Sequence, residues 1–111
     1  WKILQQKKPD DFVIATGKQL SIRQFINLVS KKLNFNIVWR GEGLNEKGFD
    51  YGTKKNIIAV DKNYIRPLDV NTILGDARKA RKLLKWKPKN NINLLINEMI
   101  ESEYKMLNAL K

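Results

Sequence analysis

The pattern of apolar and polar positions predicts a helix that begins just after Ser21. From there to residue 33 apolar side chains recur every three or four positions, so one side of this helix is expected to face a core. Ser21 and Gln24 have the spacing of a capping box, in which the hydroxyl accepts from the third backbone N–H and the glutamine reaches back. The apolar positions are Ile22, Phe25, Ile26, Val29 and Leu33.

Three further segments have helical features. Residues 1–8 are predicted to be the end of a helix. Asp76 is predicted to be the N-cap of a second helix that stops by Trp86, and Asn91 the cap of a long final helix. The inner positions of these last two helices are Ala77, Ala80 and Leu84 in the first, and Ile92, Leu95, Ile96, Met99, Ile100, Leu107 and Leu110 in the second.

Short runs rich in apolar and β-branched residues predict buried strands at residues 12–16, 35–39 and 56–60. Residues 40–55 contain four glycines and scattered charges, which is typical of a loop. Residues 64–74 are mixed, and a proline there excludes a regular helix at their start. Helices that alternate with short strands predict an α/β arrangement.

The chain is strongly basic. Its 111 residues contain 22 Lys and Arg against 11 Asp and Glu, a formal net charge of +11. Such a balance is compatible with nucleic-acid binding, but lysines outnumber arginines 17 to 5, whereas base contacts and forked phosphate contacts favour arginine. A small basic nucleic-acid-binding module therefore stays an alternative, and it predicts binding to DNA that weakens steeply with salt.

The absence of two residue types narrows the chemistry. Without cysteine there are no disulfides or thiolate metal sites, and without histidine the commonest metal ligand and general base are missing. We expect no metal. No apolar run is long enough to cross a bilayer, and residues 1–11 do not resemble a signal peptide, which predicts a soluble, cytoplasmic protein. The chain starts with Trp1 rather than Met, so we expect a processed chain or a part of a longer one.

Two candidate patterns are better explained without chemistry. The basic stretch at residues 76–89 places its charges opposite the apolar side of a predicted helix, so it is interpreted as a solvated face. Tyr51 and Lys55 have the spacing of a dehydrogenase catalytic pair, which requires a helix. Glycines flank or interrupt this spacing, and no G-x-G-x-x-G motif is present, so the pair is rejected as catalytic.

Arg66 and Asp69 lie three residues apart in a segment stiffened by proline. An arginine offers a planar fork to a phosphate, and an aspartate accepts hydrogen bonds from the two hydroxyls of a ribose. The alternative is an internal ion pair between Arg66 and Asp69. The spacing alone leaves both interpretations open.

Several motifs taken together resemble one family, in order and over nearly the whole chain. The motifs are LQQKKPDDFVIATG (4–17), SIRQF (21–25), GEGLNEKG (41–48), VDKNYIRPLDV (60–70), LGDARKAR (74–81) and LLKWKPK (83–89). With these motifs, the sequence resembles the C-terminal part of the GDP-mannose 4,6-dehydratases, which are extended short-chain dehydrogenases.

The resemblance implies that residues 1–111 are the C-terminal sugar-nucleotide-binding portion of such an enzyme, without its N-terminal NADP-binding Rossmann domain. The catalytic residues of the family lie upstream of position 1, so none is expected in this chain, and no cofactor is expected to bind it. The full-length parent would use NADP to convert GDP-mannose to GDP-4-keto-6-deoxymannose and water, and it is expected to be a homo-oligomer. A related sugar-nucleotide reductase or epimerase is an alternative, against which the GEGLNEKG motif argues.

By the same likeness, Arg66 would contact the GDP diphosphate and Asp69 the ribose hydroxyls. The dehydratases usually have Glu where this chain has Asp69, and Asp where it has Asn71. Arg23 occupies the arginine position of the family's Ser-Val-Arg-Glu-Phe motif and is a further candidate on the nucleotide side. The alternative for Arg23 is an exposed arginine on a helix.

Overall fold

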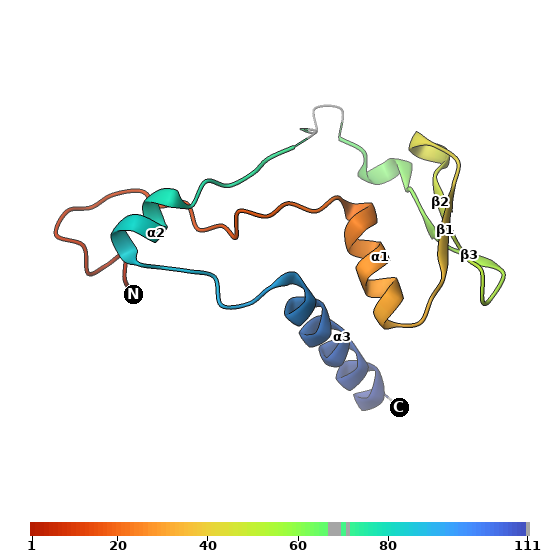
Figure 1. Cartoon of the computed structure of the whole chain (residues 1–111). Helices are drawn as coiled ribbons and strands as arrows, with labels where there is room; N and C mark the ends of the chain where they lie inside the picture. Colours follow the sequence, from red (N-terminus) through yellow and green to blue (C-terminus); the bar gives the residue numbers. More distant parts are fainter. Residues whose placement is uncertain (67–69, 71, 111) are drawn as a thin grey trace. The chain divides into compact units, whose positions relative to one another are not determined.

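The structure is a computed structural model that describes residues 1–66, 70 and 72–110. The chain divides into two compact units, which are described separately. The first combines Trp1–Gln19 with Thr72–Lys111, and the second is Leu20–Asn71. Figure 1 shows the elements along the chain. The α/β arrangement is confirmed: the described residues form three α-helices and one three-stranded antiparallel sheet.

The second unit begins with helix α1, Ile22–Lys32. Its capping box is confirmed, because the Ser21 hydroxyl accepts from the Gln24 N–H at 3.1 Å while the Ser21 N–H donates to the Gln24 side chain at 2.8 Å. The predicted apolar side is confirmed only from the second turn onward. Ile22 is 77% exposed, whereas Phe25, Ile26, Val29 and Leu33 are half-buried.

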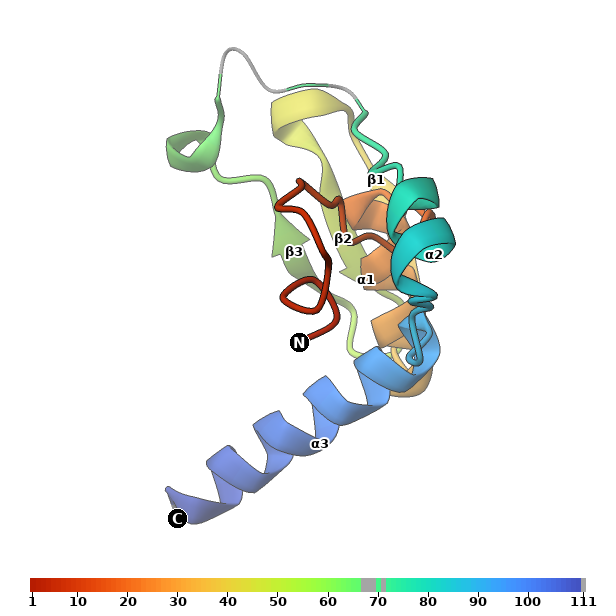
Figure 2. The ribbon, with the colours of Figure 1, turned by 90° about the vertical axis from the view of Figure 1, so that its left-hand side faces the viewer.

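The sheet of the second unit has the order β1–β2–β3, with strands Ile37–Arg40, Lys47–Asp50 and Lys55–Ala59. The predicted strands at 35–39 and 56–60 are thus confirmed within two residues. In the register, Trp39 lies opposite Gly48, which lies opposite Ile58. Figure 2 shows the sheet and α1 from a second direction.

The prediction of a loop over residues 40–55 is wrong. This stretch contains the 3-10 helix η1, Gly43–Asn45, and the central strand β2. Gly48, which suggested a turn, is a packing glycine, because a Cβ there would lie 2.9 Å from the Ile58 Cδ1 atom. The glycine thus makes room for a neighbouring isoleucine inside the sheet.

The first unit contains α2, Arg78–Leu84, and α3, Ile92–Ala109. Asn91 caps α3 as predicted, with its side chain accepting from the Leu94 N–H at 3.0 Å. Asp76 is not the N-cap of α2, which is Ala77. The carboxylate of Asp76 instead accepts from the Arg78 N–H at 2.9 Å and from its guanidinium, which lowers the Asp76 pKa to about 2. An aspartate before a helix can satisfy a first-turn N–H without being its cap.

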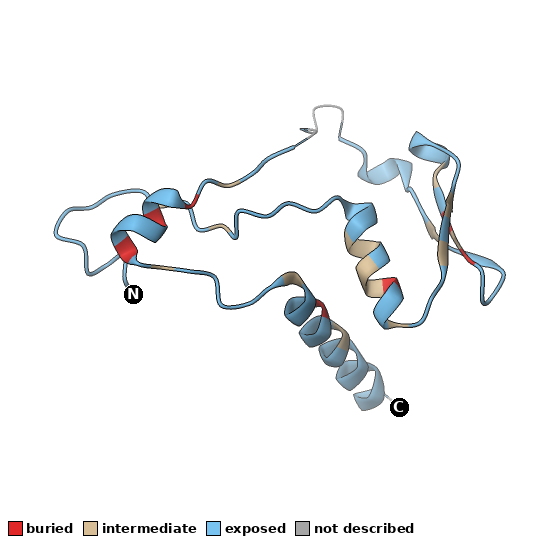
Figure 3. Cartoon of the chain, in the orientation of Figure 1, coloured by how far each residue is buried: buried red, intermediate tan, exposed pale blue. Residues whose placement is uncertain are grey.

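The expected core of the first unit is confirmed in part. Ala77, Ala80, Leu84 and Ile96 are buried, and Figure 3 shows how few buried positions there are. The rest of the apolar stripe of α3 is exposed or half-buried, with Leu110 84% exposed.

Two elements predicted at the N-terminal end are wrong. Residues 1–8 form turns and bends rather than a helix, and residues 12–16 are not in a strand. Residues 12–16 make no ladder with another strand among the described residues. The Thr16 carbonyl accepts from the Arg81 guanidinium at 2.9 Å, and Ala15 Cβ would lie 2.6 Å from a Cβ at Gly75. A backbone run without a neighbouring strand has no partner for its alternate N–H and C=O groups, so its apolar composition alone does not make it a strand.

Large apolar side chains are widely exposed in the first unit. Trp1 is 86% exposed, Leu4 83%, and both Val13 and Ile14 about half. Exposed apolar patches of this kind mark surfaces that are covered by another part of a protein or by another molecule. In the described part of the chain, no helix is long and apolar enough to span a membrane.

We expect residues 1–111, produced alone, to associate in solution. The cause is the exposed apolar surface of Trp1, Leu4, Val13 and Ile14, because removing apolar surface from water by association is favourable. Light scattering over a range of concentrations should give a mass above 13.0 kDa. A strictly monomeric species with a sharp melting transition would contradict this expectation.

Candidate functional site

Arg66 follows the 3-10 helix η2, Lys62–Tyr64, in the second unit. The Asp61 side chain caps η2 by accepting from the Asn63 N–H at 2.9 Å. The chain then passes through Ile65, the C-cap, to Arg66, whose side chain is exposed. A short capped turn therefore fixes the backbone directly before Arg66.

Asp69 lies outside the described residues, as does Asn71. The choice between a ligand contact and an internal Arg66–Asp69 ion pair is therefore still open.

Arg23 lies in the first turn of α1, and two groups of the second unit hold its side chain. Its guanidinium forms an ion pair with the carboxylate of Glu46. The guanidinium carbon also lies 5.2 Å from the centre of the Trp39 ring, within the range of a cation–π contact. The Arg23 side chain is 54% exposed, so it is an exposed helix arginine, as the alternative predicted, and it also makes these two contacts.

Trp39 and Glu46 are in turn joined to their surroundings. The indole Nε1 of Trp39 donates to the Asn27 side chain at 2.8 Å, one turn of α1 after Arg23. Glu46 ends η1, and its backbone carbonyl accepts from the Val60 N–H at 3.4 Å. These contacts connect α1, β1, the GEGLNEKG motif and the end of β3. We call Arg23, Asn27, Trp39 and Glu46 the Arg23 cluster.

Asp50 is a fully enclosed carboxylate of the second unit, with an exposed fraction of 1%. Its carboxylate accepts from the Thr53 N–H and hydroxyl, both at 2.8 Å, from Asn36 N–H at 2.9 Å and from Gly52 N–H at 3.3 Å. The bonds from Thr53, followed by those from Asn36 and Gly52, outweigh desolvation and hold the Asp50 pKa below its ordinary value of 3.8. This carboxylate organises the β2–β3 turn and is not available as a general acid at neutral pH.

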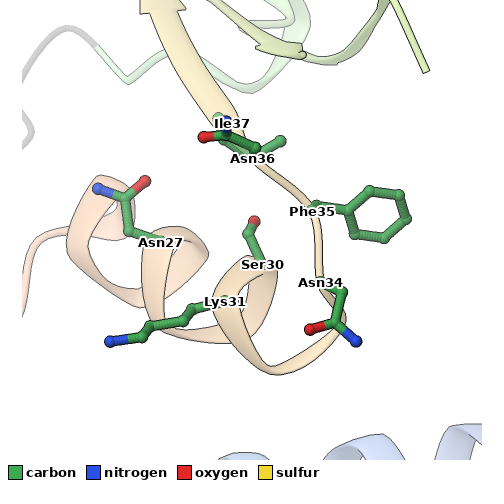
Figure 4. Close-up of a pocket in the computed structure, with 7 residues that line it drawn as sticks. All are labelled: Asn27, Ser30, Lys31, Asn34, Phe35, Asn36 and Ile37. Carbon is green, nitrogen blue, oxygen red and sulfur yellow. The ribbon is translucent and has the colours of Figure 1, made fainter. Parts of the chain in front are cut away.

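A shallow pocket of about 410 Å³ lies where α1 runs into β1. In Figure 4 the side chains of Asn27, Lys31 and Asn34 point in different directions. Because its polar groups do not converge, the pocket lacks the arrangement that orients a small ligand. None of the predicted site residues lines it; the lining residues are Asn27, Ser30, Lys31, Asn34, Phe35, Asn36 and Ile37.

The structure agrees with the two rejections made from sequence. Tyr51 lies in a turn and Lys55 begins β3, so no helix joins them. The Nζ atom of Lys54 instead lies 3.4 Å from the centre of the Tyr51 ring. In the basic stretch, Arg78 pairs with Asp76, and Lys79 donates to Asp10 at 2.5 Å. Among the residues that the structure describes, no group of acidic residues could hold a metal ion.

The structure thus does not gather the predicted site residues into one set of contacts. Arg23 is held by Glu46 and Trp39, Arg66 is exposed, and Asp69 is outside the described residues. Sequence reasoning missed the roles of Glu46 and Asp50. For Asp50 a signal was present, because an aspartate followed by Gly and Thr two and three positions later is typical of a side-chain-capped turn. For Glu46 no local signal exists, because its partner Arg23 is 23 residues away.

Comparison with known proteins gives a consistent result. The family model for GDP-mannose 4,6 dehydratase matches residues 1–99. The GDP-mannose 4,6 dehydratase 2 of Caenorhabditis elegans is 45% identical over 109 residues, which are 98% of this chain and 28% of that protein. The GDP-mannose 4,6 dehydratase of Dictyostelium discoideum is 42% identical over 103 residues, 93% of this chain and 29% of its own length.

A third relative, the GDP-mannose 4,6-dehydratase of Sinorhizobium fredii strain HH103, is 38% identical over 111 residues, 100% of this chain and 32% of its own length. The chain therefore spans less than a third of the length of these curated relatives. A match over residues 1–99 covers most of the chain, and its specific motifs lie within that range. The chain belongs to the GDP-mannose 4,6 dehydratase family.

Proposed function

We propose that this chain is the sugar-nucleotide-binding part of a GDP-mannose 4,6-dehydratase. The observation that carries the proposal is the family match over residues 1–99, together with relatives of that name which extend well beyond the matched region. In the intact enzyme the substrate would be GDP-mannose and the products GDP-4-keto-6-deoxymannose and water. The residues that perform the chemistry would lie in the part of the enzyme that precedes residue 1, and the intact enzyme would be a homo-oligomer.

The cofactor of the intact enzyme would be NADP, which accepts and returns a hydride when bound. The residues described here do not fit such a cofactor. One first-turn N–H of each long helix is taken by its cap, Gln24 N–H by Ser21 in α1 and Leu94 N–H by Asn91 in α3. A glycine-rich turn leading from a strand into a helix, the usual diphosphate cradle, is absent from the sequence.

Within this part, Arg66 would bind the diphosphate of GDP. Its side chain is exposed directly after a capped turn, so its planar fork is presented to solvent from a fixed backbone. Two parallel N–H···O bonds to a phosphate suit this geometry. Asp69 would accept from the ribose hydroxyls. Arg23, the further candidate on the nucleotide side, would support this site from α1.

We expect residues 1–111 alone to form no product from GDP-mannose and NADP, while the intact enzyme does. The physical reason is that the described residues supply neither a hydride acceptor site nor a base poised for proton abstraction. Product formation can be followed by chromatography of the sugar nucleotides. Turnover by a preparation free of the intact enzyme would overturn the proposed division of labour, and absence of turnover by the intact enzyme would overturn the proposed activity.

A further inference from the structure

We propose that Arg23 is a positioning residue that acts through Glu46 on the segment ending at Arg66, and that it does not contact the ligand. The proposal deepens the proposed function and rests on it, because it takes Arg66 as the group that binds the diphosphate. The proposal is based on the contacts within the Arg23 cluster.

The guanidinium of Arg23 makes two contacts within the second unit, although its side chain is 54% exposed. Its Nη2 donates to the Glu46 carboxylate, and its Cζ carbon lies 5.2 Å from the centre of the Trp39 ring. The Glu46 side chain is only 19% exposed, against 55% for the Asp76 side chain in the ion pair with Arg78. A carboxylate sheltered from water interacts more strongly with its partner than one on an open surface. The Arg23 guanidinium therefore already has a sheltered carboxylate as its partner.

Glu46 passes this restraint to the neighbouring strand. Its side chain is held by Arg23, while its backbone carbonyl accepts from the Val60 N–H. Val60 is followed directly by Asp61, which caps η2, and η2 leads to Arg66. The position of Glu46 therefore sets where the backbone leaves β3. Loss of Arg23 would give the backbone after β3 more conformational freedom, and the Arg66 guanidinium would then occupy a wider range of positions.

Trp39 makes the arrangement specific to arginine. The indole is fixed at its Nε1 by Asn27 and covered on its face by Arg23. A lysine could pair with Glu46, but it has no planar group that can stack on the ring while donating to a carboxylate. Arg23→Lys should therefore restore only part of the function.

Binding of GDP-mannose to the intact enzyme, measured by titration calorimetry, tests the proposal through the sign of two effects. If Arg23 acted only as a positive charge near an anionic ligand, Arg23→Ala would weaken binding and Glu46→Gln would strengthen it. Positioning requires both to weaken binding, by about three- to tenfold each, and the double variant to be no weaker than either single one. In kinetics we expect a raised KM with kcat within about twofold.

Two controls complete the experiment. Arg78→Ala removes another arginine at the start of a helix with a carboxylate partner and should leave affinity unchanged. The tryptophan emission should shift in Arg23→Ala and Glu46→Gln, because the contact between the guanidinium and the Trp39 indole is lost or changed. Neither shift should appear in a protein in which Trp39 is replaced by Phe, because the reporting indole is then absent.

The outcomes separate the two levels of the proposal. Weaker binding in Arg23→Ala with unchanged or tighter binding in Glu46→Gln would overturn positioning in favour of a direct or long-range charge effect. Unchanged affinity in both variants, with weaker binding in Arg66→Ala, would overturn positioning while the proposed function stands. An intact protein that binds no GDP-mannose would overturn the proposed function itself.

Discussion

Replacing Arg66 by Ala in the intact enzyme is expected to weaken GDP-mannose binding by roughly ten- to a hundredfold. A diphosphate gains from a forked guanidinium through two charge-assisted hydrogen bonds, which are about twice as strong as neutral ones. NADP binding should be nearly unchanged. Titration calorimetry with each nucleotide measures both effects.

Arg66→Lys should recover only part of the lost affinity, because an ammonium keeps the charge but not the bidentate geometry. The competing interpretation, in which Arg66 only pairs with Asp69, forecasts a small loss of stability and no loss of affinity. Arg66→Ala with wild-type affinity for GDP-mannose would therefore remove the diphosphate role from this residue.

Replacing Asp50 by Ala is expected to open the β2–β3 turn. Four donors from Asn36, Gly52 and Thr53 converge on this carboxylate, and its removal leaves them without an acceptor in an enclosed place. Amide hydrogen exchange should accelerate by about ten- to a hundredfold at the backbone N–H groups of these three residues. Asp61→Ala, which removes the carboxylate that caps η2, is the matched control and should leave the same amides protected.

The Asp50 carboxylate also makes the turn sensitive to acid. Its pKa in the folded chain lies below the ordinary value of 3.8, so the charged form favours the folded state. This contribution is complete above that value and is lost as the pH falls through the lower, folded pKa. Asp50→Asn should remove this part of the acid dependence. An exchange profile in acid that is the same for wild type and Asp50→Asn would contradict the account.

Local signals located helices α1, α2 and α3 and two strands, but they also wrongly predicted a helix at residues 1–8. The caps at Ser21 and Asn91 are sequence patterns that act within three residues, and both are confirmed. Strand β2 was not predicted, because a glycine such as Gly48 lowers strand propensity. In the structure the missing side chain of Gly48 leaves room for Ile58, a contact that the sequence does not reveal. Residues 12–16 have the composition of a strand, but a strand also needs a neighbour, and composition cannot supply one.

The candidate site was predictable only in its separate parts. Arg66 and Arg23 were identified by their motifs, and the structure adds that Arg23 is tied to Glu46 and Trp39. Trp39 lies 16 positions after Arg23 in the sequence, and Glu46 lies 23 positions after it. No periodicity or capping rule predicts contacts over such separations. For Asp69, whose placement is not described, the prediction stands on its motif alone.

The division into two units has a consequence for biosynthesis. The second unit is continuous, Leu20–Asn71, so all of its contacts lie within about 50 residues of one another. The first unit joins Trp1–Gln19 to a segment that begins only at Thr72. On a ribosome, the continuous unit can therefore acquire its helix and three-stranded sheet while the rest is still being made. Residues 1–19 must wait until α2 has emerged before contacts such as that between the Thr16 carbonyl and Arg81 can form, and until then they are available to a chaperone.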